Sequence, residues 1–244
     1  MTVIAIYEGE LRFCLNQHFS TMRKAAIALL LLISTCLIYS CEKDKETDQP
    51  IPPVTYPNFS KFKVGSYWVY QQFRVDSMGN ATPTNKFDSC YVEKDTIING
   101  YSYVKTYRPT DIWLNIPYTI VRDSLHYIVS MGGKVVFSSQ DFQTVFYSYY
   151  SVLDNGDTMY HATKSMEDKD LPVTTPAGTF ITSNFRKTVT YYPPFDYNGK
   201  HRYMHMRYAE NIGIVIESLP FFTSDPNYTE RRLVRYHINK FPPW

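Results

Sequence analysis

The sequence predicts an all-β protein: a single domain of antiparallel meander strands that form a curved sheet, a half-barrel or a barrel, with a β-sandwich as the alternative. From residue 59 onward, apolar and aromatic residues alternate with polar ones at a period of two, in runs bounded by turn residues. The runs recur about every 8 to 12 residues without helical segments between them. This spacing is typical of antiparallel strands and not of alternating strands and helices.

The first half of the predicted domain consists of strands joined by tight turns. Asn99-Gly100 is the strongest hairpin signal, because a type I′ turn requires positive φ at both central residues. Asp123-Ser124 and Met131-Gly132-Gly133 are also predicted turns. The expected strands, rich in β-branched and aromatic residues, are 64–73, 86–98, 101–107, 118–122, 125–130 and 134–138.

One segment carries two patterns. In residues 139–153 the apolar side chains fall at helical spacing, and Ser139 is placed to cap a helix. Residues 144–152, however, are almost all β-branched, aromatic or serine, which suit a pleated surface, so we predict a strand.

No repeat or change of composition divides residues 56–244, which we expect to form one β domain. The later expected strands are 178–192, 200–209, 212–219 and 231–240.

Residues 22–40 are typical of an export signal. Arg23 and Lys24 precede an apolar stretch of 16 residues, which at about 1.5 Å per residue is too short to cross the ~30 Å hydrocarbon core. The stretch ends in Ile38-Tyr39-Ser40-Cys41, which resembles the bacterial lipobox. That resemblance implies cleavage before Cys41 and acylation of its thiol. An ordinary secretory signal is the alternative.

The segments on either side of this signal have other compositions. Residues 1–21 are interpreted as an over-extended start, because Glu8 and Glu10 do not suit the front of an export signal. Residues 41–55 are charged and then proline-rich, which is typical of a solvated tether. We therefore expect the domain to be attached to a membrane through lipid on Cys41.

Composition and spacing argue against several kinds of site. With 25 Lys and Arg against 23 Asp and Glu, the chain lacks the excess of positive charge that nucleic acid requires. Only Cys41 and Cys90 lie beyond the signal, which excludes a disulfide framework and a four-Cys zinc site. His201 and His205 are four apart, and in a strand such positions lie about 13 Å from each other, too far for one ion. We expect no metal and no cofactor.

The sequence also contains no recognisable catalytic set, neither a Gly-x-Ser-x-Gly elbow nor a His-Glu-x-x-His motif. Cys90 falls in a predicted strand, where a lone thiol is usually packed and inert. Asp123 lies three residues before His126, but this pair is better explained by a turn. We therefore predict a non-catalytic protein. Carboxylate pairs assembled across strands stay open as an alternative.

The candidate ligand-binding residues are aromatic side chains around Pro193-Pro194. The two prolines require an extended or turning segment. Aromatic rings on a stiff loop can stack on a sugar or hold a peptide, with the tyrosine hydroxyl taking a hydrogen bond. The alternative is that these rings cover the core. The four residues are Tyr191, Tyr192, Phe195 and Tyr197.

Several segments together resemble a family of uncharacterised Bacteroidota lipoproteins. The segments are Lys63-Val64-Gly65-Ser66-Tyr67-Trp68-Val69-Tyr70, Asp95-Thr96-Ile97-Ile98-Asn99-Gly100-Tyr101-Ser102-Tyr103, Tyr149-Tyr150-Ser151-Val152-Leu153-Asp154-Asn155-Gly156-Asp157-Thr158, Thr175-Pro176-Ala177-Gly178-Thr179-Phe180 and Tyr208-Ala209-Glu210-Asn211-Ile212-Gly213-Ile214-Val215. The resemblance implies a secreted, curved antiparallel β fold. It implies no catalytic residues.

These observations lead to one expected function and two alternatives. We expect a non-catalytic lipoprotein of the bacterial cell envelope, anchored by lipid to the outer membrane, that binds a glycan, a peptide or another envelope protein. The alternatives are an envelope hydrolase acting on glycan or peptide, and a carrier that shelters an apolar ligand. A deep cleft with converging carboxylates or histidines would favour the hydrolase, an apolar cavity the carrier, and a shallow aromatic platform the binder.

Overall fold

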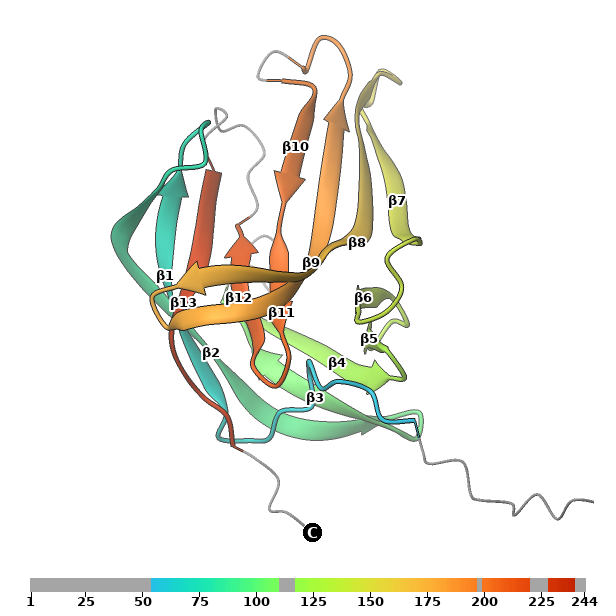
Figure 1. Ribbon diagram of the computed structural model, residues 1–244. Helices are drawn as coiled ribbons and strands as arrows, with labels where there is room; N and C mark the ends of the chain where they lie inside the picture. Colours follow the sequence, from blue (N-terminus) through green and yellow to red (C-terminus); the bar gives the residue numbers. More distant parts are fainter. Residues whose placement is uncertain (1–53, 110–116, 197–198, 220–227, 240–244) are drawn as a thin grey trace, which may run out of the picture. The chain divides into compact units, whose positions relative to one another are not determined.

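The computed structural model describes residues 54–109, 117–196, 199–219 and 228–239. Among these residues it contains thirteen strands and no helix. All the strands belong to one antiparallel sheet, which curls until it is nearly closed into a barrel (Figure 1). The predicted all-β fold is therefore confirmed, in its barrel-like form and not as a sandwich.

The strands vary in length from 4 to 18 residues. In chain order they are β1 (Tyr67–Val75), β2 (Ala81–Ile98), β3 (Tyr101–Tyr107), β4 (Tyr118–Ser124), β5 (Tyr127–Ser130), β6 (Val135–Ser138), β7 (Val145–Val152), β8 (Thr158–Thr175), β9 (Gly178–Tyr191), β10 (His201–Met204), β11 (Met206–Ala209), β12 (Gly213–Ser218) and β13 (Tyr228–His237).

The sheet is built from two meanders. They are joined in the middle of the sheet, where the first strand of the chain pairs with the last. The order is β6-β5-β4-β3-β2-β1-β13-β12-β11-β9-β8-β7, and β10 pairs with β9 beside this path. β1 and β13 are antiparallel neighbours, from Tyr67 opposite His237 to Val75 opposite Tyr228 (Figure 1). The middle of the sheet thus depends on a pairing between residues at opposite ends of the domain.

Local turn chemistry explains several strand boundaries. Asn99 and Gly100 have φ of 50° and 79°, as the type I′ prediction requires, and they join β2 to β3. The segment 144–152, which has both helical spacing and β-branched or aromatic residues, forms β7 as predicted. The turn predicted at Asp123-Ser124 was wrong, because both residues belong to β4. The chain instead turns at Leu125 (φ 56°) and the residue after it.

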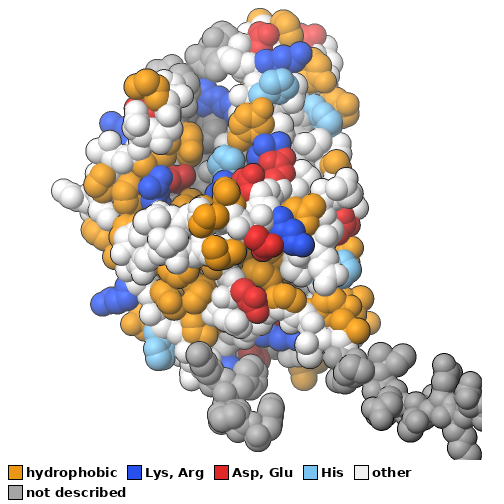
Figure 2. All heavy atoms as spheres, viewed as in Figure 1, with side chains coloured by type: hydrophobic (Ala, Val, Ile, Leu, Met, Phe, Trp, Pro, Cys, Tyr) orange, Lys and Arg blue, Asp and Glu red, His pale blue; other side chains and the backbone are white. Residues whose placement is uncertain are grey.

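The 18-residue strand β8 was not predicted, because the charged run Glu167-Asp168-Lys169-Asp170 interrupts its alternation. The ladder with β9 shifts register between Glu167 and Leu171, where Asp168 and Asp170 adopt positive φ. Arg186 and Arg207 pair with Glu167 and Asp168 at this bulge. Acidic and basic side chains accordingly lie beside one another on the face shown in Figure 2.

The predicted strand 200–209 is also divided. β10 ends at Met204 and β11 begins at Met206, so His205 interrupts the strand. β10 pairs only with β9 among the described strands, whereas β11 lies between β9 and β12. In Figure 1, β9 continues upward between β8 and β10, beyond the barrel-like part of the sheet.

The apolar core lies on the concave face of the sheet. Its largest cluster includes Trp68, Tyr70, Val215 and Leu233 from the central strands, all 4% exposed or less. Trp68 Nε1 donates to the carbonyl oxygen of Ile212 (2.6 Å). Burying these side chains removes a large apolar area from water and so stabilises the curved sheet. No described segment forms a helix long and apolar enough to span a membrane.

Candidate functional site

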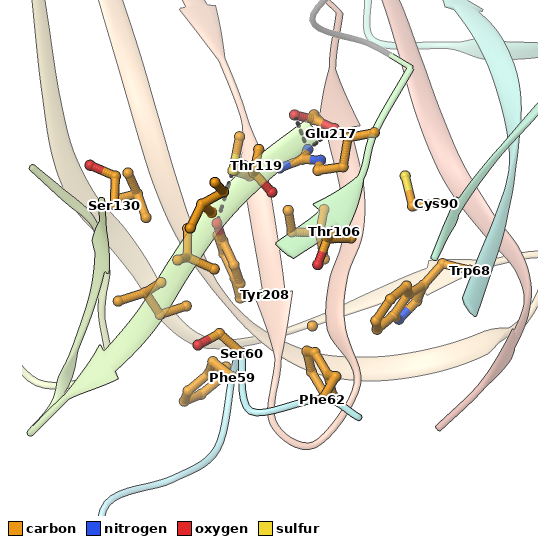
Figure 3. A pocket seen from close by; sticks show the side chains of 18 of the residues that line it. Phe59, Ser60, Phe62, Trp68, Cys90, Thr106, Thr119, Ser130, Tyr208 and Glu217 are labelled. Carbon is orange, nitrogen blue, oxygen red and sulfur yellow. Dashed lines mark hydrogen bonds and ion pairs between the residues drawn. The ribbon is translucent and has the colours of Figure 1, made fainter. Parts of the chain in front are cut away.

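The candidate site is a cavity of about 380 Å³ on the concave face of the sheet. Its walls come from β1, β2, β3, β4, β5, β6, β11 and β12, together with the segment that precedes β1. Most of the lining side chains are apolar or aromatic, and the two charged ones, Arg108 and Glu217, are hydrogen-bonded to each other. Ser60 and Ser130 line the cavity away from Glu217 (Figure 3). The cavity thus has a long apolar wall and a charged end.

The segment before β1 forms the floor of the cavity (Figure 3). Phe62 packs edge-on against Trp68, with ring centroids 5.0 Å apart, and Phe59 packs against Phe137 at 4.6 Å. Gly213 allows the Phe62 ring to pack closely against β12. Its φ is +90°, and a Cβ there would lie 3.0 Å from the Phe62 ring. This glycine therefore provides both a left-handed backbone and room for an aromatic ring.

The charged end is a buried network centred on Glu217. Arg108 Nη2 donates to both carboxylate oxygens of Glu217 at 2.6 Å, and Arg231 Nε donates to Oε2 at 2.7 Å. Arg231 Nη1 also donates to Asp88 Oδ1 at 2.8 Å. The Arg231 side chain is fully buried, and those of Arg108 and Glu217 are 13% and 10% exposed. Two guanidinium groups therefore face two carboxylates inside the fold.

Electrostatics keep this network ionised. Burial opposes the charge on Glu217, but Arg108 and Arg231 outweigh it and hold the pKa of the carboxyl below its usual value. For Arg108 and Arg231 burial again opposes the charge, yet Glu217 raises the pKa of both guanidinium groups. A carboxylate held in this way is a poor general acid or base, because such a group needs a pKa near the working pH.

The other titratable groups at the charged end stay neutral near pH 7. Burial is the main cause that raises the pKa of the Cys90 thiol, whose Sγ lies 3.4 Å from Arg231 Nη1. Burial likewise raises the pKa of the Tyr70 and Tyr208 phenols. The Tyr70 hydroxyl donates to the carbonyl oxygen of Ile214 (2.7 Å), and the centre of the Tyr70 ring lies 4.4 Å from Arg231 Cζ. Cys90 is 3% exposed, as expected of a packed thiol.

Three of the four aromatic residues predicted to bind a ligand are described, and they lie at or just after the end of β9 in different surroundings. Tyr191 is 9% exposed and packs with Ala162 and Val189, and Phe195 packs against the same cluster. Tyr192 is 37% exposed. Tyr197 and Cys41 lie outside the described residues. The structure thus brings Tyr191 and Phe195 together over a small core and leaves Tyr192 at the surface. Ligand binding by this loop stays a prediction.

The histidines weighed at the sequence level are also separated. His201 Nδ1 lies 3.1 Å from Thr190 Oγ1, whereas His205 Nδ1 lies 2.9 Å from Asn184 Nδ2. Asp123 bonds to Ser60 beside the cavity, and His126 packs against the neighbouring Tyr127 ring. In the described part of the chain, no three His, Cys, Asp or Glu side chains gather in a way that could hold a metal ion.

Sequence reasoning missed the charged end of the cavity. Its members come from β2, the residue after β3, β12 and β13, and Arg108 and Glu217 are 109 residues apart. One signal was available, because Glu217 is a lone charge within the apolar run from Ile212 to Leu219. A charge at such a position is rarely buried unless it is paired. The sequence does not indicate which cations pair with it.

The fold and the site define an antiparallel β protein with a partly open, mostly apolar cavity. No protein-family model matches the chain, and no curated protein matches it. Among solved structures, a proposed lipoprotein from Parabacteroides distasonis is similar at 12% identity and a TM-score of 0.35, covering 73% of this chain and 97% of that one.

A second similar structure is that of a proposed exported protein with a YmcC-like fold from Bacteroides fragilis. It is 15% identical, with a TM-score of 0.38, and the match covers 74% of this chain and 99% of that one. At these values neither likeness says anything about a site or an activity.

Proposed function

We propose that this chain is a lipid-anchored lipoprotein of the bacterial cell envelope that carries an apolar ligand inside its nearly closed sheet. The observation that supports this function is the cavity. Its volume of about 380 Å³ lies within the range of about 300 to 1,000 Å³ that is common for small-molecule sites, and its lining is mostly apolar, as in such sites.

The chemistry of the charged end favours a carrier over a hydrolase. Glu217, the carboxyl among the described lining residues, is held by two arginines that keep it ionised. Burial raises the pKa of Asp123, but this carboxyl bonds to Ser60 beside the cavity and does not itself line it. Cys90 is a neutral thiol, because its burial raises the pKa. A nucleophilic thiol needs a lowered pKa, and a carboxyl that acts as a general acid needs a raised one. The network therefore suits recognition and stability and not proton transfer.

The membrane attachment is proposed from the lipobox resemblance of Ile38-Tyr39-Ser40-Cys41 and the tether that follows it. We propose acylation of Cys41 and retention at the outer membrane. Cells given a labelled fatty acid should label the protein, and Cys41→Ala should abolish the label. Cys36→Ala, which changes the other cysteine of the signal, should leave the label in place. Label retained in Cys41→Ala would contradict the proposed anchor.

The cavity is tested with a fluorescent apolar probe, N-phenyl-1-naphthylamine, titrated into the full chain carrying Cys41→Ala. We expect saturable binding with an increase in fluorescence, because the probe leaves water for an apolar site. Thr119 lines the cavity from β4, so Thr119→Trp should fill part of it and weaken probe binding at least about tenfold.

The matched control is Ile97→Trp on β2, at a side chain that is 77% exposed. This variant should bind the probe like the parent. Both variants are first checked for a cooperative thermal transition, so that loss of binding is separated from loss of folding. Absence of saturable binding by the parent, or equal binding by a folded Thr119→Trp variant, would refute the proposed carrier.

A further inference from the structure

The charged end of the cavity contains hydrogen-bond donors that no described residue uses. Arg108 has five N–H donors, and the bonds to Glu217 involve only Nη2. Nε and Nη1 donate to no acceptor among the described residues, and neither is sealed from cavity or solvent. Arg108 lines the cavity, and so do the paired residues Thr106 and Thr119 (Figure 3). A ligand oxygen at this end would therefore find N–H and O–H donors.

The charges at this end are already balanced. The guanidinium groups of Arg108 and Arg231 face the carboxylates of Glu217 and Asp88. The remaining titratable groups of the network, the thiol of Cys90 and the phenols of Tyr70 and Tyr208, are neutral. A carboxylate or phosphate head would add a third negative charge at a buried position, which is costly without a further cation. An ammonium head would instead face the Arg108 donors and could not accept from them.

The rest of the cavity is suited to one hydrocarbon chain. The wall away from Arg108 is formed by Phe59, Phe62, Trp68, Ile128 and Ile214. A volume of about 380 Å³ is near the lower end of the range for small-molecule sites, which favours a ligand with one chain over one with several.

We infer that the ligand is an uncharged, single-chain amphiphile, with its tail on the apolar wall and a head oxygen, such as that of an ester or a hydroxyl, accepting hydrogen bonds from Arg108. The inference rests on the proposed carrier function and specifies the class of ligand. Arg108 is then a ligand-binding residue, and Glu217 and Arg231 hold its guanidinium group in position.

The test is displacement of N-phenyl-1-naphthylamine from the full chain carrying Cys41→Ala, at pH 8, by four competitors with the same twelve-carbon tail length. They are 1-monolauroylglycerol, laurate, dodecylammonium and dodecane, each below its aggregation limit. We expect 1-monolauroylglycerol to displace the probe at a concentration at least about tenfold lower than any other, because only it combines the tail with uncharged acceptors.

Arg108→Lys distinguishes the head site from general apolar binding. Lysine keeps the positive charge beside Glu217 but lacks the guanidinium fork. In this variant the affinity for 1-monolauroylglycerol should fall about tenfold, while the affinities for the probe and for dodecane stay unchanged. Arg74→Lys, at an exposed arginine of β1, is the matched control and should change neither.

Each contrary result has a separate meaning. Displacement by laurate equal to or better than that by 1-monolauroylglycerol overturns the uncharged head. Preference for dodecylammonium, or an Arg108→Lys variant that binds like the parent, overturns the assignment to Arg108. Equal displacement by dodecane overturns recognition of any head group. Absence of probe binding by the parent refutes the carrier function itself, and the inference with it.

Discussion

Glu217 is the residue on which the interior of the sheet depends most. It accepts hydrogen bonds from Arg108 and Arg231, and all three side chains are at least 87% buried. A buried pair adds little stability over an apolar replacement, but removal of one partner leaves the others uncompensated. The network is therefore sensitive to single substitutions although it is not the main source of stability.

We expect Glu217→Gln to lower the free energy of unfolding by about 3 to 5 kcal/mol, because Arg108 then loses its carboxylate partner and Arg231 keeps only Asp88 among the described residues. Urea denaturation followed by circular dichroism measures this change. The matched control is Glu93→Gln, which removes the exposed pair with Lys105 and should cost at most about 1 kcal/mol. Equal effects of the two substitutions would contradict the buried network.

We expect His205 to make the free energy of unfolding depend on pH. Burial, and then the nearby Arg207 and Arg186, lower the pKa of the ring from 6.5 to about 4, although Asp168 acts in the opposite direction. As the pH falls from about 6.5 to about 4, the unfolded chain binds a proton that the folded chain does not, so the free energy of unfolding decreases. Below about 4 both states are protonated and this contribution is constant.

The measurement is urea denaturation of the parent and of His205→Gln at intervals from pH 7 to pH 4. The variant should lose less stability over this interval, because glutamine does not titrate. His201→Gln changes an exposed histidine and should retain the slope of the parent. An unchanged slope in His205→Gln would show that this ring is not responsible.

At the scale of elements, the end of β9 decides between packing and recognition for the predicted aromatic loop. Tyr191 is the last residue of β9 and packs with Ala162 of β8, whereas Tyr192 follows the end of the strand and is 37% exposed. The end of the strand thus separates two neighbouring tyrosines that the sequence pattern treated alike.

We expect Tyr191→Ala to lower the free energy of unfolding by about 3 to 5 kcal/mol, the range for truncation of a large buried aromatic side chain. Tyr192→Ala should change it by about 0.5 kcal/mol or less, because the ring is 37% exposed. Thermal and urea unfolding of the two variants are compared directly. Similar losses in both would mean that Tyr192 also supports the core.

At the scale of the whole domain, the sheet depends on β13. This strand joins β1 to β12 and contributes Arg231 and Leu233, both with 0% exposure. Its partners in β1 are about 160 residues away in the sequence, so the pairing forms only when both ends of the domain meet. The two meanders have no other direct junction along the described path of the sheet.

A chain of residues 54–239 contains all thirteen strands, and we expect it to unfold in one cooperative urea transition. A chain of residues 54–219 lacks β13 and should show no cooperative transition, because Glu217 and Asp88 lose Arg231, and β1 and β12 are no longer joined. A cooperative transition in the shorter chain would show that the meanders fold independently of β13.

Features that depend on neighbouring residues could be predicted from the amino-acid sequence. Alternation of apolar and polar side chains identified most strands, and Asn99-Gly100 located a hairpin, because side-chain direction and turn geometry are local properties. The β-branched content of 144–152 correctly outweighed its helical spacing. Where a local rule was broken, as at the charged bulge in β8, prediction from pattern failed.

The order of the strands in the sheet, and the cavity that they enclose, could not be predicted from local sequence patterns. The pairing of β1 with β13, the cavity and the joining of Arg108, Glu217 and Arg231 all link residues more than a hundred positions apart, or strands that no local pattern places together. Their formation depends on closure of the sheet, in which burial of distant side chains compensates the loss of chain entropy. A buried charge such as Glu217 can be recognised as unusual in the sequence, but its partners are determined by that closure alone.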